Sequence, residues 1–80
     1  MRTPLAPSLG KRVVQTAQDR LIKSQYIILR RVSCEFDNGV LTLNGRLPSY
    51  YLKQVAQVAV AGVDGVAEIV NRIEVESSTS

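Results

Sequence analysis

Side chains that could act as acids, bases, nucleophiles or metal ligands are sparse in this chain of 80 residues. It contains no histidine and a single cysteine, Cys34. General acid–base catalysis needs a titratable group held in a pocket beside a partner, and a zinc site needs several nitrogen or sulfur ligands. The acidic residues are scattered over expected turns and outward strand positions. We therefore expect no enzyme activity, no metal site and no cofactor.

Residues 62–65 (GVDG) have the spacing of the G-x-x-G loop with which KH domains clamp a nucleic-acid backbone. The two inner residues are Val63 and Asp64, and the carboxylate of Asp64 would repel a phosphate. No aromatic residues suited to base stacking accompany this loop. Nucleic-acid binding is therefore the least expected of the binding functions.

Better candidates for binding an anion lie around the expected start of a second helix, near residue 50. The free N–H groups and the dipole of a helix start favour a negative group, and two tyrosines there can anchor in a headgroup layer. The residues concerned are Arg46, Ser49, Tyr50, Tyr51 and Lys53. The alternative is a structural helix start capped by Ser49, with one tyrosine packed over the core edge and the other exposed.

A second group of cations lies in the first part of the chain. Up to Arg46 there are eight lysines and arginines against three acidic residues, and from Leu47 onward two against four. This surface fits partners that bear phosphate groups, such as an anionic phospholipid membrane; the alternative is an ordinary solvated surface. Its cations on and just after the expected first helix are Lys11, Arg12, Arg20, Lys23, Arg30 and Arg31.

Hydrophobic periodicity places these residues on two helices and three strands. Apolar residues three or four positions apart predict amphipathic helices over residues 11–25 and 50–61. Apolar and polar residues alternate over residues 30–36, 40–44 and 66–75, which is typical of half-buried strands. Between the first two strands, Asn38 and Gly39 predict a hairpin turn, and Gly45 suits either a bulge or a close backbone approach. The apolar stripe of the first helix is Val13, Val14, Ala17, Leu21 and Ile22.

The expected fold class is α+β: a single α-β-β-α-β domain with a three-stranded mixed sheet and two helices packed on one face. A right-handed β-α-β crossover makes the last strand parallel to the second, while the strand order stays open. Cys34 lies on the apolar side of its strand, where we expect a small buried hydrophobe. Asn71 also lies on the apolar side, so we expect it to bond backbone at a helix end or to lie at a bulge.

The composition fits one small folded domain with short flexible ends. Hydrophobic residues make up 45% of the chain, which is ample for a core. We expect residues 1–10 and 77–80 to be flexible, and residues 11–76 to form the domain. Because no stretch suits a signal peptide or a membrane span, we expect a cytoplasmic protein, or a periplasmic or cell-envelope one if an export signal has been removed.

Two motifs, GVLTLNGRLPS at residues 39–49 and GVAEIVNRIEV at residues 65–75, resemble those of the BON domain, the bacterial osmotic-stress and nodulation module. The resemblance extends from about Val14 to Val75, and PSYYLKQ at residues 48–54 is similar to a planctomycete version of the domain. It implies the α-β-β-α-β fold and a non-enzymatic module that associates with phospholipid surfaces, often in the bacterial envelope.

Two functional hypotheses follow. The first is a non-catalytic module that binds anionic phospholipid, or another phosphate-rich surface, through the basic residues and tyrosines named above. The second is a protein–protein interaction or weak self-association module, which would use an exposed strand edge or the polar face of the sheet.

Overall fold

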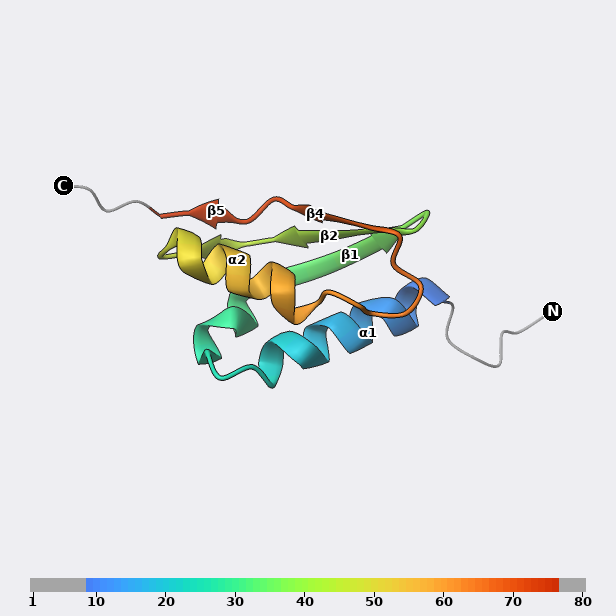
Figure 1. The fold of residues 1–80 in the computed structure, drawn as a ribbon, viewed down its shortest axis with the longest axis horizontal. Coiled ribbons are helices and arrows are strands. Elements are labelled where there is room, and N and C mark those ends of the chain that lie inside the picture. The colour runs from blue at the N-terminus through green and yellow to red at the C-terminus, as the bar shows by residue number, and fades with distance from the viewer. Residues whose placement is uncertain (1–8, 77–80) are drawn as a thin grey trace.

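The computed structural model describes residues 9–76 as two layers, a sheet and the helices that cover one of its faces (Figure 1). Three strands form a mixed sheet in the order β1-β2-β4, with β1 and β2 antiparallel and β2 and β4 parallel. The α+β prediction is therefore confirmed, and β2 is the central strand. The elements in chain order are α1 (Leu9–Ile22), the 3₁₀ helix η1 (Ile27–Arg31), β1 (Ser33–Asp37), β2 (Val40–Asn44), β3 (Arg46–Leu47), α2 (Tyr50–Ala59), β4 (Glu68–Asn71) and β5 (Glu74–Val75).

The hairpin between β1 and β2 is set by two residues in the left-handed region. Asn38 has φ 49° and Gly39 has φ 82°, and a type I′ hairpin turn requires positive φ at both of its central residues. The resulting register places Cys34 opposite Leu43, and both side chains lie in the core. The predicted hairpin and the buried position of Cys34 are confirmed.

The core lies between the sheet and both helices. Val13, Ala17 and Leu21 of α1 are each at most 2% exposed, and Ala56 of α2 is fully buried. Since they share one cluster with the inward residues of β2, α1 and α2 cover the same sheet face. Full burial of one such aliphatic side chain stabilises the fold by about 1.5–3 kcal/mol. The largest fully buried side chains are Leu21, Leu29, Leu41, Leu43, Leu47, Ile73, Val32 and Val60.

Gly45 marks a close approach between two backbone segments, as predicted. Its φ is 142°, and a Cβ atom at this position would lie 2.9 Å from the carbonyl oxygen of Arg31. Directly after it, β3 pairs in parallel with β5. Hydrophobic periodicity did not reveal β3, because two residues are too few to show a period of two.

Several boundaries differ from those predicted. α1 begins two residues before Lys11 and ends at Ile22 rather than Gln25, α2 ends at Ala59 rather than Ala61, and the last strand divides into β4 and β5. Residues 27–31 form a 3₁₀ helix, which the apolar run there did not reveal because it shows neither helical nor strand periodicity. Apart from residues 9 and 10, the expected flexible ends lie outside the described residues.

Asn71 lies where the last strand divides. Its side-chain amide donates to the carbonyl oxygen of Lys53 at 3.0 Å and to Oε1 of Gln57 at 3.2 Å, and its Oδ1 accepts the N–H of Ile73 at 3.1 Å. The prediction that this amide bonds backbone is confirmed, and the strand is interrupted directly after it. The helix contact is in the middle of α2 instead of at its end.

Candidate functional site

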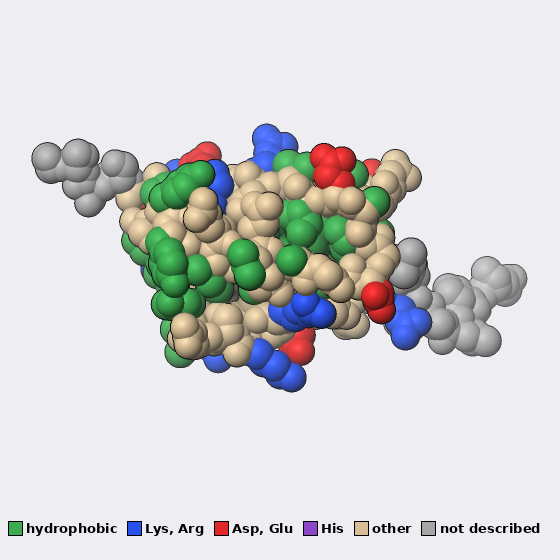
Figure 2. Space-filling model, in the orientation of Figure 1, with side chains coloured by type: hydrophobic (Ala, Val, Ile, Leu, Met, Phe, Trp, Pro, Cys, Tyr) green, Lys and Arg blue, Asp and Glu red, His purple; other side chains and the backbone are tan. Residues whose placement is uncertain are grey.

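Exposed apolar side chains gather at one end of the molecule, where the start of α2 lies near η1 (at the left of Figure 2). Ile27 is 68% exposed, Tyr50 62%, Tyr51 60% and Ile22 45%. Tyr26, which is half-buried, contacts Tyr51. We call these five residues the aromatic end.

A pair of tyrosines holds the aromatic end together. The hydroxyl oxygens of Tyr26 and Tyr51 lie 3.1 Å apart, and the rings meet edge to face with centroids 6.0 Å apart at 83°, a favourable arrangement for aromatic rings. The shared hydrogen bond lowers the pKa of Tyr26 and raises the pKa of Tyr51, because only one of the two hydroxyls can ionise and still accept from the other. The pair links the segment before η1 to the first turn of α2.

Ser49 fixes where α2 begins and thus how Tyr50 and Tyr51 are presented. Its backbone is extended, and its hydroxyl oxygen accepts the N–H of Leu52 at 3.2 Å, the usual geometry of an N-cap. The structural alternative for Ser49 is therefore confirmed. The accompanying expectation that one tyrosine packs over the core edge is wrong, because Tyr51 rests against Tyr26 and remains mostly exposed.

Three of the predicted cations have partners that can be named among the described residues. Arg46 lies 3.5 Å from Glu74 and Lys23 lies 3.3 Å from Asp19, both pairs being exposed and therefore weak. The guanidinium of Arg20 donates to the carbonyl oxygen of Ala61 at 2.9 Å. Arg20 thus supports the chain directly after α2.

The predicted site residues fall into two separate groups. One lies directly after α1, on η1 and around the start of α2, close to the aromatic end: Lys23, Arg30, Arg31, Arg46, Ser49, Tyr50, Tyr51 and Lys53. The other group lies on α1 itself, with Lys11 and Arg12 near its start and Arg20 in its last turn. Lys11 and Lys23 are twelve residues apart, which is about 18 Å along a helix, so a single small anion does not contact both.

Sequence reasoning missed Ile22, Tyr26 and Ile27 as parts of the candidate surface. It placed Ile22 in the core. In the structure, Ile22 is exposed because α1 ends at this residue. A signal was present at residues 26–29, where four apolar residues follow one another. Neither a helix nor a strand with one buried face can bury every residue of such a run.

Within the part of the chain that the structure describes, this surface has no cluster of potential metal ligands. Among residues 9–76, no three His, Cys, Asp or Glu side chains lie close enough together to hold a metal ion. Burial of Cys34 raises the pKa of its thiol to about 11, which disfavours the reactive thiolate. No helix in the described part of the chain is sufficiently long and apolar to cross a membrane.

The fold is that of a small α+β domain with one exposed apolar end. The model of the BON domain family matches residues 11–77, and the chain belongs to this family. BON domains are binding modules of non-catalytic type. A search of curated proteins finds no match for the chain.

Proposed function

We propose that this BON domain docks on anionic phospholipid surfaces through its aromatic end. The observation that carries the proposal is the exposure of Ile27, Tyr50 and Tyr51 around the contact between Tyr26 and Tyr51. Cationic residues follow within a few positions on both η1 and α2. Tyrosine partitions into the interfacial layer of a bilayer, with its ring among the upper acyl carbons and its hydroxyl among the headgroups. Phospholipid binding is the role associated with BON domains.

Cations around the aromatic end supply the electrostatic part of the proposed binding. Arg30, Arg31 and Lys53 have no ion pair among the residues described, whereas Lys23 and Arg46 have exposed acidic partners. Each lysine or arginine near an anionic leaflet contributes about 1 kcal/mol. Three to five such contacts give reversible binding that weakens as salt rises.

Two carboxylates lie near the β1–β2 hairpin, away from the aromatic end. The β1–β2 hairpin lies at the end of the molecule opposite η1 and the start of α2 (Figure 1). Two carboxylates belong to that far end: Asp37 ends β1, and Glu68 donates its backbone N–H to Gly39 of the hairpin turn. Docking by the aromatic end therefore keeps these carboxylates away from the anionic surface.

Co-sedimentation with vesicles tests the proposal. Vesicles rich in phosphatidylglycerol should bind the protein at low salt, phosphatidylcholine vesicles should bind it far less, and about 1 M salt should release it. The double variant Ile27→Ser/Tyr50→Ser should bind at least about tenfold more weakly, a loss of about 1.4 kcal/mol.

Val58→Ser is the matched control, because Val58 is 72% exposed on α2 and lies seven residues beyond Tyr51, about 10 Å along the helix. This variant should bind vesicles like the parent protein. Absence of binding to anionic vesicles, or an equal loss in Val58→Ser, would refute docking by the aromatic end.

Self-association is the second candidate function, and the sheet topology favours it. Among residues 9–76, β1 and β4 each pair with one neighbour, so each presents one strand edge that a further strand can extend. The edge at β4 and β5 carries Glu68, Arg72 and Glu74, and charged residues commonly protect edges from pairing. A mass that rises with protein concentration in sedimentation equilibrium, without lipid, would support this function; a constant monomer mass would exclude it.

A further inference from the structure

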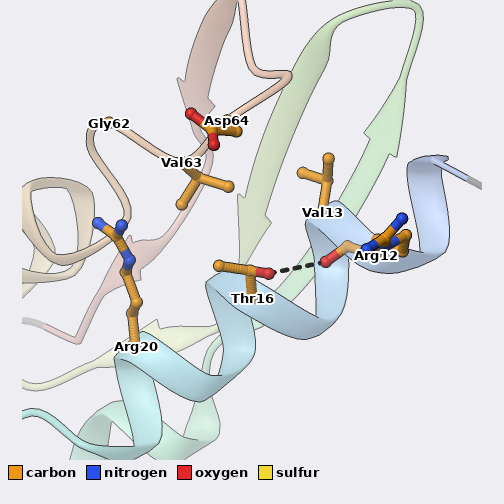
Figure 3. Close-up of a pocket in the computed structure, with 7 residues that line it drawn as sticks. All are labelled: Arg12, Val13, Thr16, Arg20, Gly62, Val63 and Asp64. Carbon is orange, nitrogen blue, oxygen red and sulfur yellow. Dashed lines mark hydrogen bonds between the residues drawn. The ribbon is translucent and has the colours of Figure 1, made fainter.

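A groove of about 470 Å³ separates α1 from the turn that follows α2 (Figure 3). One wall is formed by Arg12, Thr16 and Arg20, which are four residues apart and therefore share one side of the helix. The opposite wall is residues 62–64. Val13 and Val63, at 2% and 4% exposure, supply a buried apolar floor.

Arg20 is held in a fixed position on this groove. Its guanidinium reaches from α1 to the turn near Gly62 (Figure 3) and donates one hydrogen bond to Ala61, 2.9 Å long. A guanidinium carries five N–H donors, so donors remain for a ligand. Because this hydrogen bond already restricts the guanidinium, hydrogen bonds from its remaining N–H groups to a ligand cost less conformational entropy.

Charges of opposite sign face the groove without neutralising each other. Asp64 lies on the turn, across from the two arginines on α1 (Figure 3). Neither Arg12 nor Asp64 forms an ion pair within residues 9–76, and both are exposed. A simple anion would be attracted by the arginines and repelled by Asp64, and a simple cation would meet the reverse.

We infer that this groove binds a small zwitterion in which a phosphate ester and a primary ammonium are a few bonds apart. Phosphoethanolamine, free or as a lipid headgroup, is the simplest such molecule. The arginines match phosphate, whose oxygens accept paired hydrogen bonds from a guanidinium. The ammonium has three donors for the carboxylate of Asp64. The carboxylate of Asp64 disfavours binding of a nucleic-acid backbone. In this groove the same carboxylate selects a ligand that also carries an ammonium group.

Titration of the ¹⁵N-labelled protein with free phosphoethanolamine, followed by NMR, tests this inference. The amides of Thr16 and residues 62–65 should shift and saturate, with orthophosphate, ethanolamine and phosphocholine each binding at least about tenfold more weakly, equivalent to about 1.4 kcal/mol. Arg12→Gln should weaken phosphoethanolamine binding by a similar factor. Asp64→Asn should remove the preference for phosphoethanolamine over orthophosphate.

Arg30→Gln provides a matched control, since it removes one exposed positive charge from η1, outside the groove. It should bind phosphoethanolamine like the parent protein. Arg12, Asp64 and Arg30 are all exposed, so these variants should fold normally. Equal affinity for orthophosphate and phosphoethanolamine, or saturable shifts unchanged by Asp64→Asn, would overturn the inference, as would no shift at millimolar ligand.

The experiments can refute phosphoethanolamine binding in the groove and membrane docking by the aromatic end separately, because the two surfaces share no residue. Ile27→Ser/Tyr50→Ser should bind free phosphoethanolamine normally even though it docks poorly on anionic vesicles. Bicelles with and without phosphatidylethanolamine separate the two sources of the ligand. Groove shifts with such bicelles indicate the lipid headgroup, and shifts with the free compound alone indicate a soluble zwitterion.

Discussion

Asn71 donates a hydrogen bond to the backbone carbonyl of Lys53, 3.0 Å away, and so fastens the end of β4 to the middle of α2. Its Oδ1 also accepts the N–H of Ile73, just where the last strand divides into β4 and β5. One side chain therefore bridges the interruption in the sheet and positions the helix above it. Tyr50 and Tyr51, on the first turn of α2, depend on that position.

Asn71→Ala should lower the free energy of unfolding by about 2 kcal/mol, because the N–H of the buried Ile73 loses its side-chain acceptor. Urea denaturation measures the change. Gln57→Ala removes only the exposed second acceptor of the Asn71 amide and should cost less than about 0.5 kcal/mol. Equal losses in the two variants would contradict the role given to Asn71.

Gly45→Ala should destabilise the domain more than Gly62→Ala. Both glycines have positive φ, but a Cβ on Gly45 would lie 2.9 Å from the Arg31 oxygen, while one on Gly62 would meet nothing within 4 Å. We expect about 1 kcal/mol for Gly62→Ala, the cost of the left-handed backbone, and at least about 2 kcal/mol for Gly45→Ala. Thermal unfolding of the two variants ranks them, and the reverse order would refute the close approach.

Cys34 should make the stability of the domain fall at alkaline pH. Burial raises the pKa of its thiol from 9.0 to about 11, so the folded protein retains this proton where the unfolded chain has released it. The contribution of the protonated thiol to the free energy of unfolding is on the order of 2 kcal/mol. It is fully present below about pH 9 and is lost as the pH rises through 11. In urea denaturation, the stability difference between the parent protein and Cys34→Ala should shrink over this range. A constant difference would contradict the assigned pKa.

Tyr51→Phe should raise the pKa of Tyr26 toward its ordinary value. The hydrogen bond from Tyr51 is the main cause of the lowered pKa of Tyr26, and phenylalanine keeps the ring but cannot donate. Titration followed by NMR of the tyrosine Cζ carbons resolves each residue. Tyr50→Phe is the control and should leave Tyr26 unchanged; a Tyr26 titration unaffected by Tyr51→Phe would show that the hydroxyls do not pair in solution.

The sequence by itself determined the local structure of this protein. Asn38 and Gly39 specify their turn because few other residues accept positive φ, and the alternation over residues 40–44 gives β2 its bounds and its buried side. Ser49 likewise marks the start of α2 through one bond to a residue three positions away. The parallel pairing of the last strand followed from the β-α-β connection, because a strand that returns after a crossover helix runs parallel to the strand before it.

Only the tertiary structure decided which distant residues meet. The pairing of Tyr26 with Tyr51, the ion pair of Arg46 with Glu74, and the groove between α1 and Asp64 all join positions more than twenty residues apart. Hydrophobic periodicity reports which side of an element is buried, but it carries no information about the neighbour across a corner or a helix end. For this reason the sequence located the folded core more accurately than the surfaces on which binding depends.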